Sequence, residues 1–457
     1  MTRYLLTISL GPVQGFIAAA RRTRDSWMGS AILGECAKAV ARELIQPTMV
    51  DLGFPTCEQL IFPAVDRDDI DKDLKSIQFH QDNTQLHNAF DVSNVITALV
   101  HGNDDQMRSL SNRLNEIAQN RWREIARKAA TYSQSHLRDD WKDQLQERLI
   151  EFYSAWTPFA ADSDYGVARR QVSRLLAGRK ACRDFDWWTG KQLVPKSSLD
   201  GARETVLKVV TASQRRPRGR LRVKPNEQLD LIGLTKRVDW GHDAIRYPSV
   251  SRVAIEPFVA AISRLQATDH EVATLFRCVE TTCEALRDLG ALRKRKDQNP
   301  KGIEDDLKKF AWMKPFPFEG TPLFVSRHQE IEKELQEEAS KPDESAVDES
   351  AVDETAIRVL LRQLHTEVST LQKACDISKP WEYAAFLVAD GDGMGATLSK
   401  LAEQPNGMDL HRTFSKRQSE FATKARELIN TEFGACFYAG ADDVLAMVSV
   451  HRAIECA

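Results

Sequence analysis

Two short acidic motifs lie towards the C-terminal end of the sequence, each beside an apolar segment. Asp390 precedes a glycine-rich turn, and Asp442 and Asp443 stand in a Gly-Ala-Asp-Asp turn. Clustered carboxylates repel one another unless a cation lies between them, and hard oxygen ligands suit Mg²⁺ or Mn²⁺. We therefore predict that Asp390, Asp442 and Asp443 form a metal site. Metals held on such carboxylates can align a hydroxyl with an α-phosphate, so these would be the catalytic residues of a nucleotidyl transfer.

The segments around the two motifs must bring the carboxylates together. Residues 384–389 form an apolar run that predicts a strand, and residues 435–438 and 444–450 predict the two strands of a hairpin. If the first strand pairs beside the hairpin, Asp390 can meet the Asp442 and Asp443 pair. A helix is predicted between them because apolar residues recur near helical spacing, among them Phe414, Phe421 and Leu428.

The glycines of the first motif could hold phosphates. Without a side chain, a glycine leaves its backbone N–H free to approach a triphosphate closely. The predicted nucleotide-binding residues are Gly391, Asp392, Gly393, Met394, Gly395, Gly440 and Ala441. For either motif alone a solvated acidic turn is an equal alternative, because Asp and Gly are ordinary turn residues. The two motifs together, in this strand context, favour the metal site.

Composition limits the class of protein. A chain of 457 residues with 42% hydrophobic residues predicts about two to four domains. No apolar run has the length of a membrane span, and the N-terminus lacks the pattern of a signal peptide, so no membrane partner is expected. The 8 cysteines are scattered without a Cys-x-x-Cys pair, which indicates a reducing, cytoplasmic setting. The net charge of -3 confines any nucleic-acid contact to local patches.

The rest of the chain predicts an α+β protein. Strands are predicted at 4–10, 59–62 and 92–100, a helix with Phe16, Ile17 and Ala20 on one face after the first strand, and a long helix from 103 to about 152. This order is typical of a ferredoxin-like fold. The predicted division is a first domain at 1–160, an irregular domain at 161–255, a helical region at 256–335, an acidic repeat linker at 336–357 and a last domain at 358–457.

The acidic motifs resemble the palm domain of nucleotide cyclases and polymerases. Asp-Gly-Asp-Gly-Met-Gly at 390–395 and Gly-Ala-Asp-Asp at 440–443 look most like the large polymerase/cyclase-like subunit of type III-B (Cmr) CRISPR effector complexes. Residues 5–30 are similar to the N-terminal signature of that family. Tyr-Pro-Ser-Val-Ser-Arg-Val-Ala at 247–254 is similar to a second sequence motif of the family. The resemblance implies two ferredoxin-like palm domains, with the second incomplete at the C-terminus of this sequence.

The resemblance also implies an activity and partners. ATP would be converted to cyclic oligoadenylate when target RNA binds, with Mg²⁺ or Mn²⁺ as the cofactor, in antiviral defence. The partners would be guide RNA, target RNA, single-stranded DNA and the other subunits of the complex. The first palm has Gly11-Pro12-Val13-Gln14 where the second has Asp390, so it should bind no metal. Gln14 could contact a second nucleotide, or the segment could only fix strand–helix packing.

Three further segments bear on metal and nucleic-acid binding. Ser197 and Asp200 stand where relatives carry a zinc-binding Cys pair, so no zinc is expected. His242-Asp243 lacks the further ligands of a His-Asp nuclease and the first palm begins at once, so no such nuclease is expected. The densest basic loop predicts contact with nucleic-acid phosphates, although a solvated loop is nearly as favoured. Its arginines are Arg215, Arg216, Arg218, Arg220 and Arg222.

Two other functions remain open from the sequence. The family usually has Gly-Gly-Asp-Asp, whereas this chain has Ala441 at the second position. If that position needs a positive φ, alanine costs on the order of 1 kcal/mol or more. A catalytically silent scaffold that binds guide RNA, target RNA and partner subunits is therefore the alternative. A stand-alone diguanylate-type cyclase is a weaker one, because nothing N-terminal resembles a sensor domain.

Overall fold

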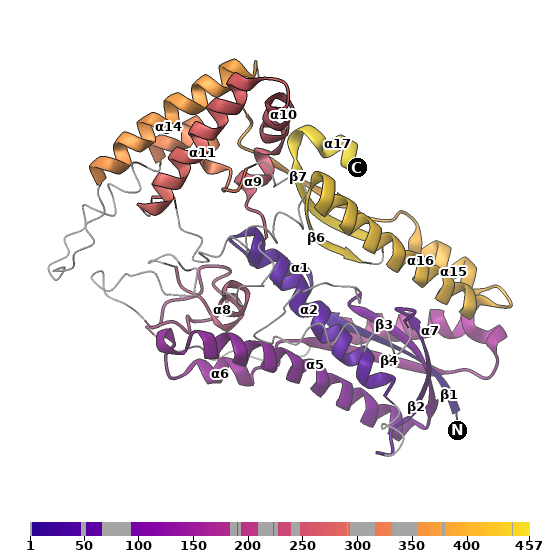
Figure 1. The fold of residues 1–457 in the computed structure, drawn as a ribbon. Helices are drawn as coiled ribbons and strands as arrows, with labels where there is room; N and C mark the ends of the chain where they lie inside the picture. The colour runs from indigo at the N-terminus through magenta and orange to yellow at the C-terminus, as the bar shows by residue number, and fades with distance from the viewer. Residues whose placement is uncertain are drawn as a thin grey trace.

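The structure is a computed structural model. It describes residues 2–46, 52–65, 93–182, 190, 193–208, 223, 227–238, 247–289, 291–292, 316–330, 332, 354–376, 380–440 and 442–457. This part of the chain combines helices with two antiparallel sheets, one of four strands and one of three, and a separate group of helices packs at the far end from the N-terminus (Figure 1). The α+β prediction is therefore correct at the level of a mixed fold.

The first sheet lies in the N-terminal part of the chain. Its strands are β1 (Thr2–Gly11), β2 (Thr56–Phe62), β3 (Val95–Gly102) and β4 (Glu151–Pro158). Their order is β2-β3-β1-β4, and each neighbouring pair is antiparallel. Helix α2 (Thr23–Leu44) follows β1, and α5 (Asp104–Tyr132) follows β3. The sequence of strand, helix, strand, strand, helix, strand is that of the ferredoxin-like fold.

Two local predictions in this region are wrong. The helix predicted to reach about residue 152 ends at Tyr132, and after the short helix α6 (Trp141–Gln146) the chain forms β4. Along β4, Tyr153 and Ala155 are buried while their neighbours are partly exposed, which is the two-residue period of a strand. The helix after β1, α1 (Gln14–Ala18), has only Phe16 buried, so the predicted face with Ile17 and Ala20 is not formed.

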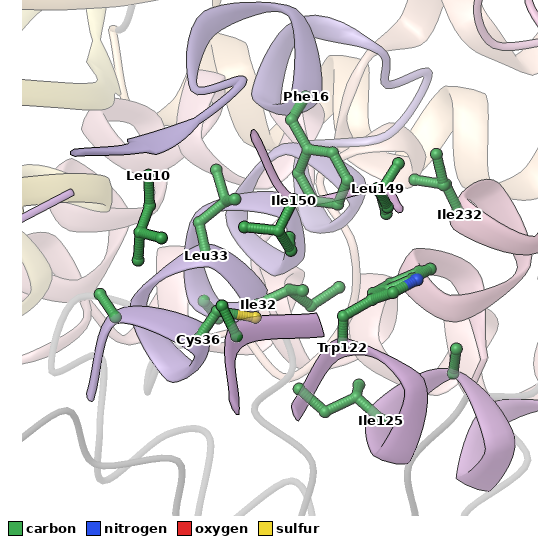
Figure 2. Packing of buried hydrophobic residues seen from close by; sticks show 14 of the residues in the cluster. Leu10, Phe16, Ile32, Leu33, Cys36, Trp122, Ile125, Leu149, Ile150 and Ile232 are labelled. Carbon is green, nitrogen blue, oxygen red and sulfur yellow. The ribbon is translucent and has the colours of Figure 1, made fainter. Parts of the chain in front are cut away.

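The helices α2 and α5 cover one face of the first sheet and form the largest core with it (Figure 2). Alternate residues of β1, including Leu6 and Leu10, point into this core. Phe16 meets Trp122 edge to face, with ring centroids 6.4 Å apart. Burying each large apolar side chain stabilises the fold by about 1.5–3 kcal/mol, so this core fixes where β1 ends and α1 begins.

The opposite face of the first sheet is covered by α7 (Tyr165–Ala181). The irregular domain was predicted to cover 161–255, but its first part is the regular helix α7. Leu5 and Tyr153 of the sheet pack against the apolar side of α7. That side repeats at helical spacing, with buried residues Tyr165, Ala168, Val172 and Leu176. Farther along, α8 (Leu231–Arg237) is held to α2 by Arg237, whose guanidinium lies 2.7 Å from the Asp25 carboxylate.

The predicted helical region is present. It contains α9 (Val250–Ala254), α10 (Glu256–Gln266) and α11 (His270–Asp288). Helix α14 (Glu354–Ala374) packs against α11 in the same core (Figure 1). We predicted a linker to 357 and the last domain from 358, and both boundaries are wrong because α14 belongs to this helical core. Its buried residues recur every three or four positions and are Ile357, Leu361, Leu364, Val368 and Leu371.

The second sheet follows. Its strands β5 (Ala384–Ala389), β6 (Gly434–Gly440) and β7 (Asp443–Ser449) lie in the order β5-β7-β6, with antiparallel neighbours, as the sequence predicts. Helices α15 (Met394–Ala402) and α16 (Gly407–Leu428) lie between β5 and β6, and α17 (Ala453–Cys456) ends the chain. Helix α16 and the turn that follows it cover one face of the sheet, where Ala422 and Ile429 pack against strand residues such as Val444. Phe421 and Leu428 are exposed, so the predicted apolar stripe is not its buried side.

Helix α16 also joins the second sheet to the first. The Tyr165 hydroxyl and Nδ1 of His411 lie 2.5 Å apart, and the Phe62 ring stacks on the imidazole. The Oγ of Ser415 accepts a hydrogen bond of 2.9 Å from the backbone N–H of Ala64. The two sheets are therefore fixed relative to one another by buried contacts.

Among the helices described here, none is both long enough and apolar enough to cross a membrane. All eight cysteines are free thiols.

Candidate metal and nucleotide site

The three predicted acidic residues meet at one end of the second sheet. Strand β5 pairs with β7 up to Ala389 and Val444, so Asp390 emerges beside Asp443, the first residue of β7. Asp442 stands one residue earlier, in the turn from β6. One carboxylate oxygen of each of the three residues lies within 4.8 Å of those of the other two. The strand pairing on which the prediction depended is therefore formed.

The electrostatics of this cluster favour a positive ion. Partial loss of hydration at the strand end, a hydrogen bond with Asp390 and the charge of Asp442 together raise the pKa of Asp443 to about 6. A raised pKa means that the three carboxylates are stabilised when they share a proton. A divalent cation bound between them would relieve the same repulsion. The donor set consists only of carboxylate oxygens, which fits Mg²⁺ or Mn²⁺.

The glycines of the first motif have different structural roles. A Cβ placed on Gly391 would lie 2.7 Å from the Cβ of Asp442 and 2.9 Å from Cγ of Met394, so only glycine lets these elements approach so closely. Gly393 has φ +69° and is the N-cap of α15, a left-handed conformation that glycine adopts without strain. At Gly395 a Cβ would meet no atom within 4 Å, so packing does not require glycine there. Asp392 is exposed in the same turn.

Tyr438 belongs to the site, although the sequence analysis did not identify it. Its ring runs along β6 towards the turn, and a Cβ on Gly440 would lie 2.6 Å from its hydroxyl. Burial and, to a lesser extent, the charges of Asp443 and Asp442 together raise the pKa of Tyr438 to about 12. A β-bulge between Cys436 and Tyr438 sets the position of this side chain. No local pattern in the sequence marks this bulge.

Several predicted residues cannot be placed. Ala441 and the arginines of the basic loop, Arg215, Arg216, Arg218, Arg220 and Arg222, lie outside the described residues, as does the His242-Asp243 pair. Gln14 is exposed at the first position of α1. It therefore follows the end of β1 in the way that the metal motif follows β5.

The segment that resembles a zinc site is held by ordinary turn contacts. The Ser197 hydroxyl donates to Oδ1 of Asp230 over 3.3 Å. Oδ1 of Asp200 accepts from the backbone N–H of Ala202 over 3.0 Å. Within the described part of the chain, the cluster of Asp390, Asp442 and Asp443 is the group of three or more His, Cys, Asp or Glu side chains arranged closely enough to share a metal ion.

Comparisons with known proteins place this geometry in a class. Residues 383–457, which contain all three carboxylates, match the family described as Cas10/Cmr2, second palm domain. Residues 5–127 match the family described as CRISPR-associated protein Cmr2, N-terminal. The second sheet and its acidic end therefore belong to the palm class. An N-terminal and a C-terminal part of the chain thus each resemble Cas10/Cmr2 proteins.

One solved structure supports the fold. The chain is similar to one described as "Type III-B Cmr-beta Cryo-EM structure of the Apo state", with 14% identity and a TM-score of 0.50 over 100% of this chain and 60% of that one. Another is "Cryo-EM structure of the Type III-B Cmr-beta bound to cognate target RNA", with 13% identity and a TM-score of 0.49 over 100% and 61%. The chain thus spans less than two thirds of those chains. Among curated proteins, none matches.

Proposed function

We propose that this chain is a subunit of a type III CRISPR RNA-guided effector complex in antiviral defence, and that it acts there as a metal-dependent nucleotidyl cyclase. It would convert ATP to cyclic oligoadenylate when target RNA binds. One observation carries the proposal: the carboxylates of Asp390, Asp442 and Asp443 converge within the segment that matches a second palm domain. The shared strand order supports treating the first sheet as a first palm.

The chain's own residues would bind both the cation and the phosphates. Asp390, Asp442 and Asp443 would hold Mg²⁺ or Mn²⁺. When bound, such a metal activates an attacking hydroxyl and neutralises charge on the leaving group. The absence of a side chain at Gly391 allows Asp442 to approach the turn that follows Asp390. The first N–H groups of α15, which begins at Met394, have no partner within the helix and favour a phosphate nearby.

The reaction proposed is a transfer between two nucleotides. The 3′-oxygen of one ATP would form a bond to the α-phosphorus of the next. The bond from that phosphorus to the pyrophosphate oxygen would break, the hydroxyl proton would pass to water, and pyrophosphate would leave. At its corresponding strand end the first sheet has Gly11-Pro12 in place of the Asp390 motif, and the exposed Gln14 could contact the second nucleotide there. This division gives one catalytic palm and one that positions substrate.

The proposed partners are guide RNA, target RNA, single-stranded DNA and the other subunits of the complex, in the cytoplasm. Their support is the resemblance of the sequence motifs and the two family matches. The basic loop with Arg215, Arg216, Arg218, Arg220 and Arg222 is the proposed contact for nucleic-acid phosphates. Binding there should weaken as salt concentration rises, because phosphate contacts release counterions.

The test uses the effector complex with guide RNA and matching target RNA. It is incubated with ATP and either Mg²⁺ or Mn²⁺, and the products are identified by mass spectrometry. The variant Asp442→Ala/Asp443→Ala should lose cyclic oligoadenylate. The control Glu420→Ala/Glu427→Ala removes two exposed carboxylates from α16 of the same region and should keep the activity.

The outcome separates this function from the scaffold. If the complex binds target RNA but forms no product with either metal, the cyclase is rejected. The alternative of a catalytically silent subunit that binds RNA and partner subunits would then be preferred, with Ala441 as the first residue to revert to glycine. If the product persists in the Asp442→Ala/Asp443→Ala variant, the carboxylate site is rejected as its source.

A further inference from the structure

The face of the second sheet opposite α16 has an unusual surface next to the carboxylates. Side chains alternate between the two faces of a strand, so Phe386, Val388 and Asp390 project on the same side of β5. The other side of β5, including Leu387, packs towards α16. Val388 is 73% exposed and Phe386 is 61% exposed. Two large apolar side chains therefore face solvent directly behind the acidic end of the strand.

The strand register extends this surface across the sheet. Val388 pairs with Leu445 on β7, and Leu445 pairs with Tyr438 on β6. Directly paired residues share a face, so these three side chains form one row. The carboxylates of Asp390 and Asp443 form the next row towards the turn. We call Val388, Leu445 and Tyr438, together with Phe386, the apolar floor.

The apolar floor rests on a stack of aromatic rings. Phe386 stacks on Phe437, with ring centroids 5.9 Å apart and planes inclined by 23°. Phe437 in turn lies 4.9 Å from Tyr247, and Tyr247 lies 6.0 Å from Trp27 of α2. Phe437, Tyr247 and Trp27 are buried, so the exposed ring of Phe386 has a rigid support that reaches the first sheet's helices.

We propose that the apolar floor binds the sugar and base of a nucleotide whose phosphates lie at the carboxylates, an inference that rests on the nucleotide site proposed above. An exposed apolar patch bordered by charged groups is typical of a ligand surface. Successive residues on one face of a strand are roughly 7 Å apart, so Phe386 lies two such steps behind Asp390. A nucleotide has this polarity, with anionic phosphates at one end and a flat base at the other. Base stacking on Phe386 would use the exposed ring.

The test compares two probes on the full chain in the presence of Mn²⁺. ATP carries phosphates, sugar and base, whereas inorganic triphosphate carries the phosphates alone. Phe386→Ala is expected to weaken ATP binding by about tenfold, because stacking on an aromatic side chain contributes that much. Val388→Ser should weaken ATP binding by less, because it removes apolar contact but no ring, and both variants should leave triphosphate binding unchanged. Phe386→Trp keeps a ring and should retain ATP binding. Val359→Ser changes a valine that is 58% exposed on α14 and should bind both probes like wild type.

The outcomes distinguish failure of this inference from failure of the proposed function. If Phe386→Ala and Val388→Ser bind ATP as tightly as wild type, the apolar floor has another occupant and the inference is overturned, while the carboxylate site stands. If wild type binds neither ATP nor triphosphate with Mn²⁺, the proposed nucleotide site itself fails, and the inference fails with it. Equal loss of both probes in the variants also overturns it, because it would show general damage. Thermal unfolding of each variant should match wild type, since both changed side chains are exposed.

Discussion

The two sheets share one strand order but differ at their ends and on their faces. In the first, β2-β3-β1 lie side by side, and in the second β6-β7-β5 take the same positions. Strand β1 runs into Gly11-Pro12, whereas β5 runs into Asp390 and Gly391. The first sheet is covered on both faces, by α2 and α5 on one side and α7 on the other. The second exposes Phe386 and Val388 on one face.

This difference shows that the shared strand order fixes which strand ends lie together. The residues at those ends decide whether a metal can bind there. The shared order brings the end of the first strand next to the start of the third in both sheets. At that meeting point the second sheet brings three carboxylates within 4.8 Å of one another, the cluster of this kind among the described residues. The first sheet uses its covered faces to build the main core. One sheet is therefore a support and the other, with an open face, is a candidate site.

The largest expected effect concerns stability. Leu5 of β1 is fully buried between the first sheet and α7, so Leu5→Ala should lower the free energy of unfolding by about 2–5 kcal/mol. Val388→Ala on the open face should change it by less than about 0.5 kcal/mol. Urea unfolding followed by circular dichroism measures both. Similar losses for the two variants would show that the second sheet's face is covered in solution.

The next prediction concerns metal binding at the two strand ends. Asp390→Ala should weaken Mn²⁺ binding by roughly 100-fold, because even an outer-shell partner of a metal ligand contributes roughly 10–100-fold to affinity. Gln14→Ala changes the corresponding end of the first sheet and should leave the affinity unaltered. Electron paramagnetic resonance of free Mn²⁺ during a titration provides the measurement. Unchanged binding in Asp390→Ala would remove this residue from the site.

Two glycines of the same motif should respond in opposite directions. Gly391→Ala places a methyl group 2.7 Å from the Cβ of Asp442, so it should destabilise the fold by about 1–3 kcal/mol and weaken Mn²⁺ binding. Gly395→Ala meets no atom within 4 Å inside α15 and should stabilise the protein by up to about 1 kcal/mol. Thermal unfolding with and without Mn²⁺ distinguishes them. Equal behaviour of the two variants would contradict the close approach at Gly391.

The smallest expected effect is a pH dependence at the junction of the two sheets. Burial against Tyr165 and Phe62 and the charge of the nearby Arg169 together lower the pKa of His411 from 6.5 to about 4. The unfolded chain therefore takes up this proton at a higher pH than the folded one. The stability contributed by neutral His411 is complete above pH 6.5 and is lost as the pH falls towards 4.

At pH 5 this loss should be about 1–2 kcal/mol relative to pH 7. Urea unfolding of wild type at the two pH values is compared with His411→Gln, which has no group that titrates in this range. The variant should be less stable at pH 7 and should show a smaller difference between the two pH values. The same pH dependence in both proteins would mean that other groups cause it.

The local motifs were accessible from the residues alone. The apolar runs around Asp390 and the Asp442–Asp443 turn predicted the three strands of the second sheet to within a few residues, because alternation and turn residues are local signals. The helical region was predicted from apolar residues at three- and four-residue spacing, which is also a local signal. The signal for α14 was also present in the spacing of Ile357, Leu361 and Leu364, and the acidic repeat before it obscured the start of the helix.

Other features depend on contacts between segments far apart in the chain. Strand β4 follows a long helix, and only pairing with β1 makes it a strand. The buried side of α16 has His411 and Ser415 and not Phe421, because the neighbouring α7 and the segment after β2 offer polar partners there. The place of Tyr438 beside Gly440 comes from a bulge that no local pattern marks.

Residue type and spacing were thus sufficient for the identity of the acidic groups and for the strands that carry them. The distance between those groups, the close approach at Gly391 and the open face behind them arise from the pairing of β5 with β7 and from the side of the sheet that α16 covers. The physical reason is the distance along the chain over which each effect acts. Turn chemistry and periodicity act within a few residues, whereas pKa shifts, steric limits and exposure depend on which distant side chains become neighbours.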